Sequence, residues 1–130
     1  MVRHFLYIND EINKVNIYES SIIAIDFSQY PTMLTFHIDW TEGPPIRLQF
    51  IDCIELDCDL SPNKDMKIPN LLINLEIQGF IYPKISNVYH AQLNFWGEPK
   101  GSIKIRCAGI QIITTSLPIT EGGQSYSIYE

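Results

Sequence analysis

Apolar and polar residues alternate with a period of two along most of this chain. Successive side chains of a β-strand point to opposite faces of the sheet, so such alternation predicts strands with one buried face. The first clear run ends at a Gly-Pro-Pro sequence over residues 43–45, which is a turn signal. Its apolar positions, predicted to face the core, are Leu34, Phe36, Ile38 and Trp40.

The same pattern recurs in further segments that are separated by turn signals. Residues 61–69 are polar, include two prolines and are predicted to form a loop. The sequence over residues 98–101, Glu-Pro-Lys-Gly, suits a tight turn that joins two strands into a hairpin. The strands are expected over residues 3–8, 20–27, 34–40, 46–60, 71–78, 89–95 and 103–112.

Two positions disturb the alternation. Between residues 46 and 60 only Asp52 interrupts the apolar row, so Asp52-Cys53 marks either a bend in one long strand or a tight hairpin. With this parity Ile54 faces the core. At Ala108-Gly109 the parity shifts, which predicts a β-bulge at Gly109.

Helical spacing is confined to residues 9–16, where Ile12 and Val15 suit one face of a helix of one or two turns. Many short strands with turns between them are typical of an all-β domain. The sequence therefore predicts a single domain over residues 1–130, built as an antiparallel β-sandwich or an open barrel. Residues 119–130 are expected to form either an edge strand or a frayed tail.

The chain is acidic, with a formal net charge of −6 over 130 residues. Nucleic acids and anionic lipid surfaces attract basic patches, so the charge predicts neither nucleic acid nor a membrane as partner. It is compatible with a basic protein partner, and also with an acidic protein whose charge only keeps it soluble. The oligomeric state does not follow from the sequence.

The compartment follows from three further features. The apolar run at the N-terminus is too short for a signal peptide, and no stretch is long and apolar enough to span a bilayer. Three cysteines cannot all pair within the chain, which is typical of a reducing compartment. We therefore expect a cytoplasmic protein.

Recognisable motifs for catalysis, metal binding and phosphate binding are missing from the sequence. Its three histidines stand in no motif, its cysteines have no C-x-x-C spacing, and no glycine-rich phosphate loop is present. The expectation is a protein that is not an enzyme and that holds no metal and no cofactor.

One candidate binding feature is a row of acidic residues. Glu55, Asp57 and Asp59 occupy alternate positions of one predicted strand, with Asp52 just before them. Alternate residues share a strand face, so the three carboxylates stand together opposite the core. The row is either a solvated face that blocks aggregation or a docking stripe for a basic partner.

The second candidate is Trp96. By parity it belongs to the polar face of its strand, together with His90, Gln92 and Asn94. An exposed tryptophan is a typical contact anchor. The alternative is that its ring lies under a loop at the strand end.

Two segments carry a resemblance to a known family. The stretch over residues 46–56, IRLQFIDCIEL, and the stretch over residues 101–112, GSIKIRCAGIQI, resemble strands of small bacterial immunity proteins of polymorphic-toxin and contact-dependent growth inhibition systems. The resemblance implies a non-enzymatic protein that binds a toxin domain and blocks its active site or substrate access. Many such toxins are basic nucleases, which would give the acidic row a partner.

Two other functions remain open. One is a carbohydrate- or small-ligand-binding β-sandwich, in which Trp96 stacks on a sugar while Gln92 and Asn94 bind its hydroxyl groups. The other is a subunit or accessory domain of a larger assembly.

Overall fold

The computed structural model describes residues 2–61, 75–96, 100–116 and 124–128. Within these ranges most residues lie in β-strands, which confirms the predicted all-β fold. The one helical element there is a 3₁₀ helix, η1 (Asn9–Lys14), on which Ile12 is buried as its spacing predicted. The strands are β1 (Val2–Ile8), β2 (Ser21–Asp26), β3 (Met33–Asp39), β4 (Ile46–Ser61), β5 (Glu76–Ile81), β6 (Lys84–Ile85), β7 (Val88–Trp96), β8 (Lys100–Thr114) and β9 (Gln124–Ile128).

All strand pairs are antiparallel, and the sheet closes on itself. Its order is β6-β7-β5-β2-β3-β4-β8-β1-β9, and β7 also pairs with β8. A ring therefore runs through β5, β2, β3, β4, β8 and β7. The join between β2 and β5 is short: the Ile22 N–H donates to the Leu75 carbonyl at 3.1 Å, and the Ile77 N–H donates to the Ser20 carbonyl at 2.9 Å.

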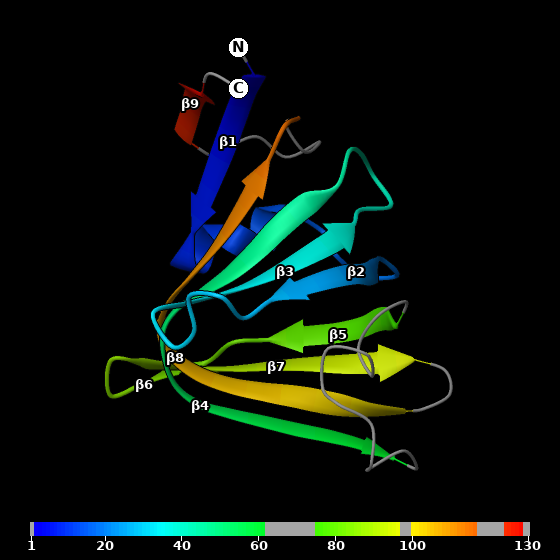
Figure 1. Cartoon of the computed structure of the whole chain (residues 1–130), viewed down its shortest axis with the longest axis vertical. Coiled ribbons are helices and arrows are strands. Elements are labelled where there is room, and N and C mark those ends of the chain that lie inside the picture. The colour runs from blue at the N-terminus through cyan, green and yellow to red at the C-terminus, as the bar shows by residue number, and fades with distance from the viewer. Residues whose placement is uncertain (1, 62–74, 97–99, 117–123, 129–130) are drawn as a thin grey trace.

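The two longest strands connect the two halves of the ring. Figure 1 shows β4 and β8 bending together, with β5 and β7 near one half of the pair and β2 and β3 near the other. The first half of β4, residues 46–51, pairs with β3, whereas β8 accompanies β4 from residue 47 to residue 61. Asp52-Cys53 is thus a bend in one long strand, and Asp52 takes a positive φ of 51° there.

The interior of the ring is filled by the apolar faces of its strands. Phe50 lies at its centre, with its ring 5.5 Å from that of Phe36 and 6.4 Å from that of Phe80 (centroid distances, edge-on packing). Trp40 is buried as predicted, and its indole N–H donates to the Asn16 carbonyl at 2.7 Å. Other buried residues of this core include Ile22, Leu34, Ile38, Ile46, Leu48, Ile77, Leu93, Phe95, Ile103, Ile105, Ile110 and Ile112.

Two predictions at the bend were wrong. Ile54 is 59% exposed rather than buried, because it is the extra residue of a bulge between the Cys53–Cys107 and Glu55–Arg106 pairs. The strand pairing runs without a shift past Gly109, so the predicted bulge lies on β4 instead. The shift in the alternation of buried positions on β8 has another cause. β4 and β8 bend together, and beyond the bend each strand buries its other face.

Other boundaries differ less from the predictions. β5 continues to Ile81, past the predicted strand end at residue 78, with a register shift between Ile77 and Gly79. β7 and β8 form the predicted hairpin, although residues 97–99 of its turn lie outside the described ranges, as do residues 62–74. β9 pairs with β1 as an edge strand. An edge strand was one of the two alternatives predicted for the C-terminal segment.

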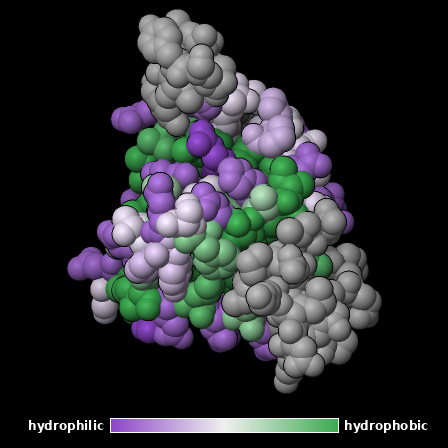
Figure 2. All heavy atoms as spheres, viewed as in Figure 1, coloured by the Kyte–Doolittle hydropathy of each residue, from purple (hydrophilic) through white to green (hydrophobic). Residues whose placement is uncertain are grey.

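The surface mixes hydrophilic and hydrophobic side chains. Figure 2 shows one face, on which hydrophilic residues are interspersed with hydrophobic ones. A hydrophobic group at the lower left lies where Figure 1 places β6. Large exposed apolar side chains on and beside this short strand are Ile81 and Ile85.

Candidate functional site

The predicted acidic row lies on the second half of β4, on the outside of the ring. Glu55, Asp57 and Asp59 are all exposed, while the alternating Leu56 and Cys58 pack partly against the core. The row therefore has the geometry expected from strand alternation, beginning after the bulge at Ile54.

A basic row on the neighbouring strand lies directly beside it. Arg106 is the register partner of Glu55 and Lys104 is the partner of Asp57, whereas Asp59 faces Ser102. An ion pair joins the Arg106 guanidinium to the Glu55 carboxylate. Opposite charges on directly paired residues of a sheet attract one another. Three carboxylates thus meet two cations on this face, and the Asp59 end keeps its negative charge without a cation across the register.

The third strand of this face adds an imidazole and an amide. His90 pairs with Arg106, and Gln92 pairs with Lys104, across β7 and β8. A shallow depression of about 270 Å³ runs over the three strands. Its lining comprises Glu55, Asp57, His90, Ala91, Gln92, Lys104, Ile105 and Arg106. The depression can receive charged or amide side chains of either polarity.

The other predicted contact residues do not join the row. Asp52 is exposed at the bend, where its N–H donates to the Thr32 carbonyl at 2.9 Å, and the bulge separates it from Glu55. Trp96 ends β7, where it pairs with Glu76 of β5, and β8 separates its strand from β4. The side chain of Trp96 lies outside the described residues, so its exposure stays a prediction.

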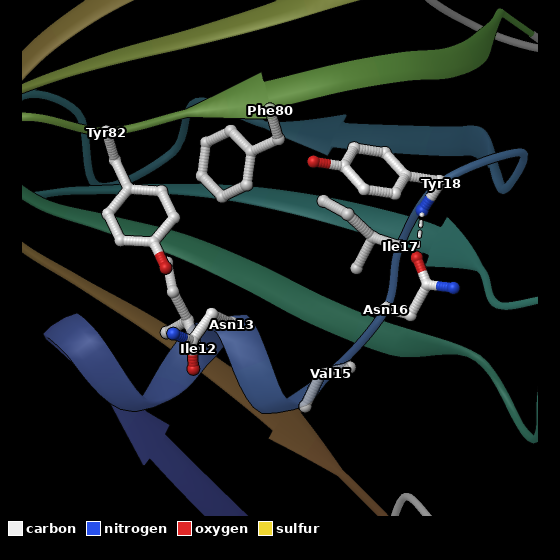
Figure 3. Close-up of a pocket in the computed structure, with 8 residues that line it drawn as sticks. All are labelled: Ile12, Asn13, Val15, Asn16, Ile17, Tyr18, Phe80 and Tyr82. Atoms are coloured by element: carbon white, nitrogen blue, oxygen red, sulfur yellow. Dashed lines mark hydrogen bonds between the residues drawn. The ribbon is translucent and has the colours of Figure 1, made fainter.

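A second concave site lies between residues 12–18 and the end of β5. A pocket of about 310 Å³ is formed where η1 and the segment after it meet the end of β5. Figure 3 shows the aromatic rings of Tyr82, Phe80 and Tyr18 in a row, with the Tyr18 hydroxyl directed toward Phe80. Ile12, Asn13 and Val15 lie on the other side of the pocket.

Sequence reasoning missed both the basic row and this pocket. The alternation of Lys104 and Arg106 was visible in the sequence, but only the pairing of β8 with β4 sets these cations against the carboxylates. The pocket joins residues 12–18 to residues 80–82. No periodic pattern links two segments so far apart in the chain, so no signal in the sequence could have found the pocket.

Two cysteines face each other beneath the bend. Cys53 and Cys107 are register partners, and both are buried. Burial, with a contribution from Asp52, raises the pKa of the Cys53 thiol to about 11. Burial, together with the neighbouring Cys53, raises the pKa of the Cys107 thiol to about 12. Both thiols are therefore protonated at neutral pH, and a protonated thiol is a poor nucleophile.

Metal binding and membrane insertion require arrangements that can be recognised from geometry and composition. Across the described ranges, no group of three or more His, Cys, Asp or Glu side chains is arranged to hold a metal ion. None of the helical structure described is long and apolar enough to cross a membrane.

Comparison with known proteins gives no family for this chain. No model of a known protein family matches it, and a search of curated proteins found no match either.

Proposed function

We propose that this chain is a non-enzymatic binding protein that recognises a basic partner through the outer face of β4. The observation that carries the proposal is the row of three exposed carboxylates, Glu55, Asp57 and Asp59, on one rigid strand. We further propose that the partner is a bacterial toxin domain, which makes the chain an immunity protein. A basic nuclease fits the charge of the row and the net charge of −6.

The rigidity of the strand supports a binding role. β4 is paired with β8 along the whole row, so the three carboxylates are held at fixed spacing by the backbone. A pre-ordered surface loses little conformational freedom when a partner binds, which favours affinity. Exposed charges at such a surface mainly accelerate encounter with a partner of opposite charge.

Arg106 and Lys104 give the face a mixed charge pattern. A partner that matches it must place cations over the acidic row and an acceptor or anion over β8. Mixed patterns discriminate between partners, because like charges brought together at an interface are repulsive. The pattern therefore supports recognition of one particular basic protein rather than attraction of basic proteins in general.

The sugar-binding alternative has no observation in its favour on this face. The Gln92 amide N–H donates to the Asn94 amide oxygen at 2.9 Å, so these two side chains satisfy each other in part. The exposure of the Trp96 ring, on which stacking would depend, stays a prediction.

The proposal is tested by purifying the chain and mixing it with the toxin domain encoded beside its gene. We expect a complex of defined stoichiometry by size-exclusion chromatography and calorimetry, together with inhibition of the toxin's activity. Because both outcomes depend on the partner, a toxin domain from an unrelated locus serves as the control. Absence of a complex at micromolar concentrations, with the toxin still fully active, would contradict the proposal, and so would catalytic activity of the chain by itself.

A further inference from the structure

The pocket in Figure 3 has the composition of a binding site for a small organic molecule. Its volume of about 310 Å³ lies at the lower end of the range for ligand pockets. Three aromatic rings supply most of one side: Tyr18 is 48% exposed, Tyr82 is partly buried and Phe80 is nearly buried. The centroids of the Phe80 and Tyr82 rings are 5.1 Å apart, with their planes inclined at 40°.

The segment that carries Tyr18 is held in place by hydrogen bonds. The Asn16 carbonyl accepts a hydrogen bond from the Trp40 indole, and the Asn16 amide oxygen accepts one from the Tyr18 N–H at 3.1 Å. One residue later, the Glu19 N–H donates to the Ile77 carbonyl at 2.7 Å. These bonds tie residues 16–19 to β5 and to the core, so the pocket is pre-formed.

The aromatic rings and a nearby carboxylate are the features of the pocket that favour a positively charged ligand. The faces of aromatic rings carry partial negative charge, and Asp10 on η1 lies close enough to help raise the pKa of the Tyr82 phenol, after the larger effect of burial. None of the described residues that line the pocket is cationic. In the same region the fold already places a cation on a ring, since the Lys84 ammonium lies 5.3 Å from the centroid of Tyr89.

We propose that this pocket binds an organic cation that carries an alkylated ammonium group. Aromatic faces attract cations, and the attraction is strongest for cations that shed water easily. Ile12, Val15 and Ile17 border the pocket and are each at most 3% exposed, so its buried edge is apolar and suits methyl groups better than the hydration shell of a bare ammonium ion. The proposal does not depend on the acidic row of β4, which lies on other strands.

Choline is the probe, and its uncharged isostere 3,3-dimethyl-1-butanol is the matched control for shape. Binding to the purified chain is followed by NMR shift titration. We expect choline to bind about tenfold more tightly than the isostere, in keeping with the strength of cation–π contacts. The largest shifts should fall on residues 12–18 and 80–82.

Variants then separate the rings from unspecific effects. Tyr18→Leu combined with Tyr82→Leu retains apolar volume but removes two ring faces, and it should reduce the preference for choline to less than threefold. Tyr30→Leu alters an exposed tyrosine outside the pocket and should leave binding unchanged. Asp10→Asn should weaken choline binding severalfold and leave binding of the isostere unaffected.

Three results would overturn the proposal. The first is equal binding of choline and the isostere, and the second is absence of choline binding at millimolar concentrations. The third is unaltered choline binding by the Tyr18→Leu/Tyr82→Leu variant. If that variant does not fold, Asp10→Asn serves instead, because Asp10 is exposed on η1. Choline binding that is unchanged in Asp10→Asn would then overturn the proposal.

Discussion

Glu55 on β4 forms an ion pair with Arg106, its register partner on β8, and each side chain is about half exposed at 53% and 45% respectively. Glu55 is the first residue of the acidic row, so the positive charge of Arg106 offsets the negative charge at this end. The other end, at Asp59, stays acidic. Its position on the outer face makes it a feature of recognition rather than of the core.

Loss of this ion pair should have little effect on stability. Exposed ion pairs contribute about 0.2–1 kcal/mol, because water screens the charges and ordering two long side chains costs entropy. We expect Glu55→Gln and Arg106→Gln each to change the free energy of unfolding by less than about 1 kcal/mol in urea denaturation. A loss of several kcal/mol in either variant would show that the pair is a structural element of the fold.

The bulge at Ile54 can be tested with two isoleucines on the paired strands. Ile110, which pairs with Phe50, is 1% exposed, so Ile110→Ala should lower the free energy of unfolding by about 2–5 kcal/mol. Ile54→Ala removes the same atoms from an exposed position and should change it by less than about 0.5 kcal/mol. Equal destabilisation by the two changes in denaturant titrations would place Ile54 in the core and contradict the bulge.

The backbone of Asp52 provides a test of the bend. Its φ of 51° is a conformation that costs most L-residues about 1–2 kcal/mol and costs glycine almost nothing. Because Asp52 is exposed, packing adds little to the effect of substitution. Asp52→Gly should retain the stability of the protein, whereas Asp52→Val should lower it by about 1–2 kcal/mol in thermal and urea unfolding. Equal stability of the two variants would be inconsistent with the positive φ.

Most of the fold could be predicted because strand alternation is a local property of the sequence. The run ending at Trp40 and the β7–β8 hairpin were found in this way, because the alternating apolar residues of each strand are the ones buried in the core. The sequence located an irregularity at Asp52-Cys53 but could not show whether it is a bend or a hairpin. An interruption of the apolar row is expected in both cases. Register shifts are harder to predict. Ile54 is an extra residue only in relation to β8, and a local pattern does not show which strand pairs with β4.

The candidate site was predictable to a smaller extent for the same reason. The exposure of Glu55 and its two successors followed from alternation alone. The position of Arg106 and Lys104 opposite Glu55 and Asp57 depends on which strand lies beside β4. The aromatic pocket depends on where η1 and the segment after it lie relative to the end of β5, which no pattern of single residues describes.

The buried cysteine pair predicts a loss of stability at alkaline pH. The ordinary thiol pKa is 9.0, and the folded chain raises it to about 11 at Cys53 and about 12 at Cys107. Their stabilising contribution is complete below about pH 9 and is lost as the pH rises through the folded values, because the unfolded chain releases its thiol protons first. The free energy of unfolding should therefore fall between about pH 9 and pH 12.

The double variant Cys53→Ala/Cys107→Ala isolates this effect from the titration of lysines and tyrosines. Its stability should decline less steeply over the same pH range, whatever its stability at pH 7. Parallel curves for the variant and the unaltered chain would mean that both thiols titrate normally in the folded state.

Recognition of a basic partner by the acidic row of β4 is tested by the association rate of the toxin complex at two salt concentrations. The test variant is Glu55→Gln/Asp57→Asn/Asp59→Asn. A control with the same change in net charge is Glu11→Gln/Asp39→Asn/Glu42→Gln, which alters three exposed carboxylates elsewhere on the surface. Thermal melts establish that both variants are folded.

At low salt the row variant should associate about tenfold more slowly, and its rate should depend less on salt, because steering by exposed charges is screened by ions. The control variant should be slowed far less. Association rates of the row variant that equal those of the unaltered chain at both salt concentrations would contradict the account and leave the row as a solvated strand face.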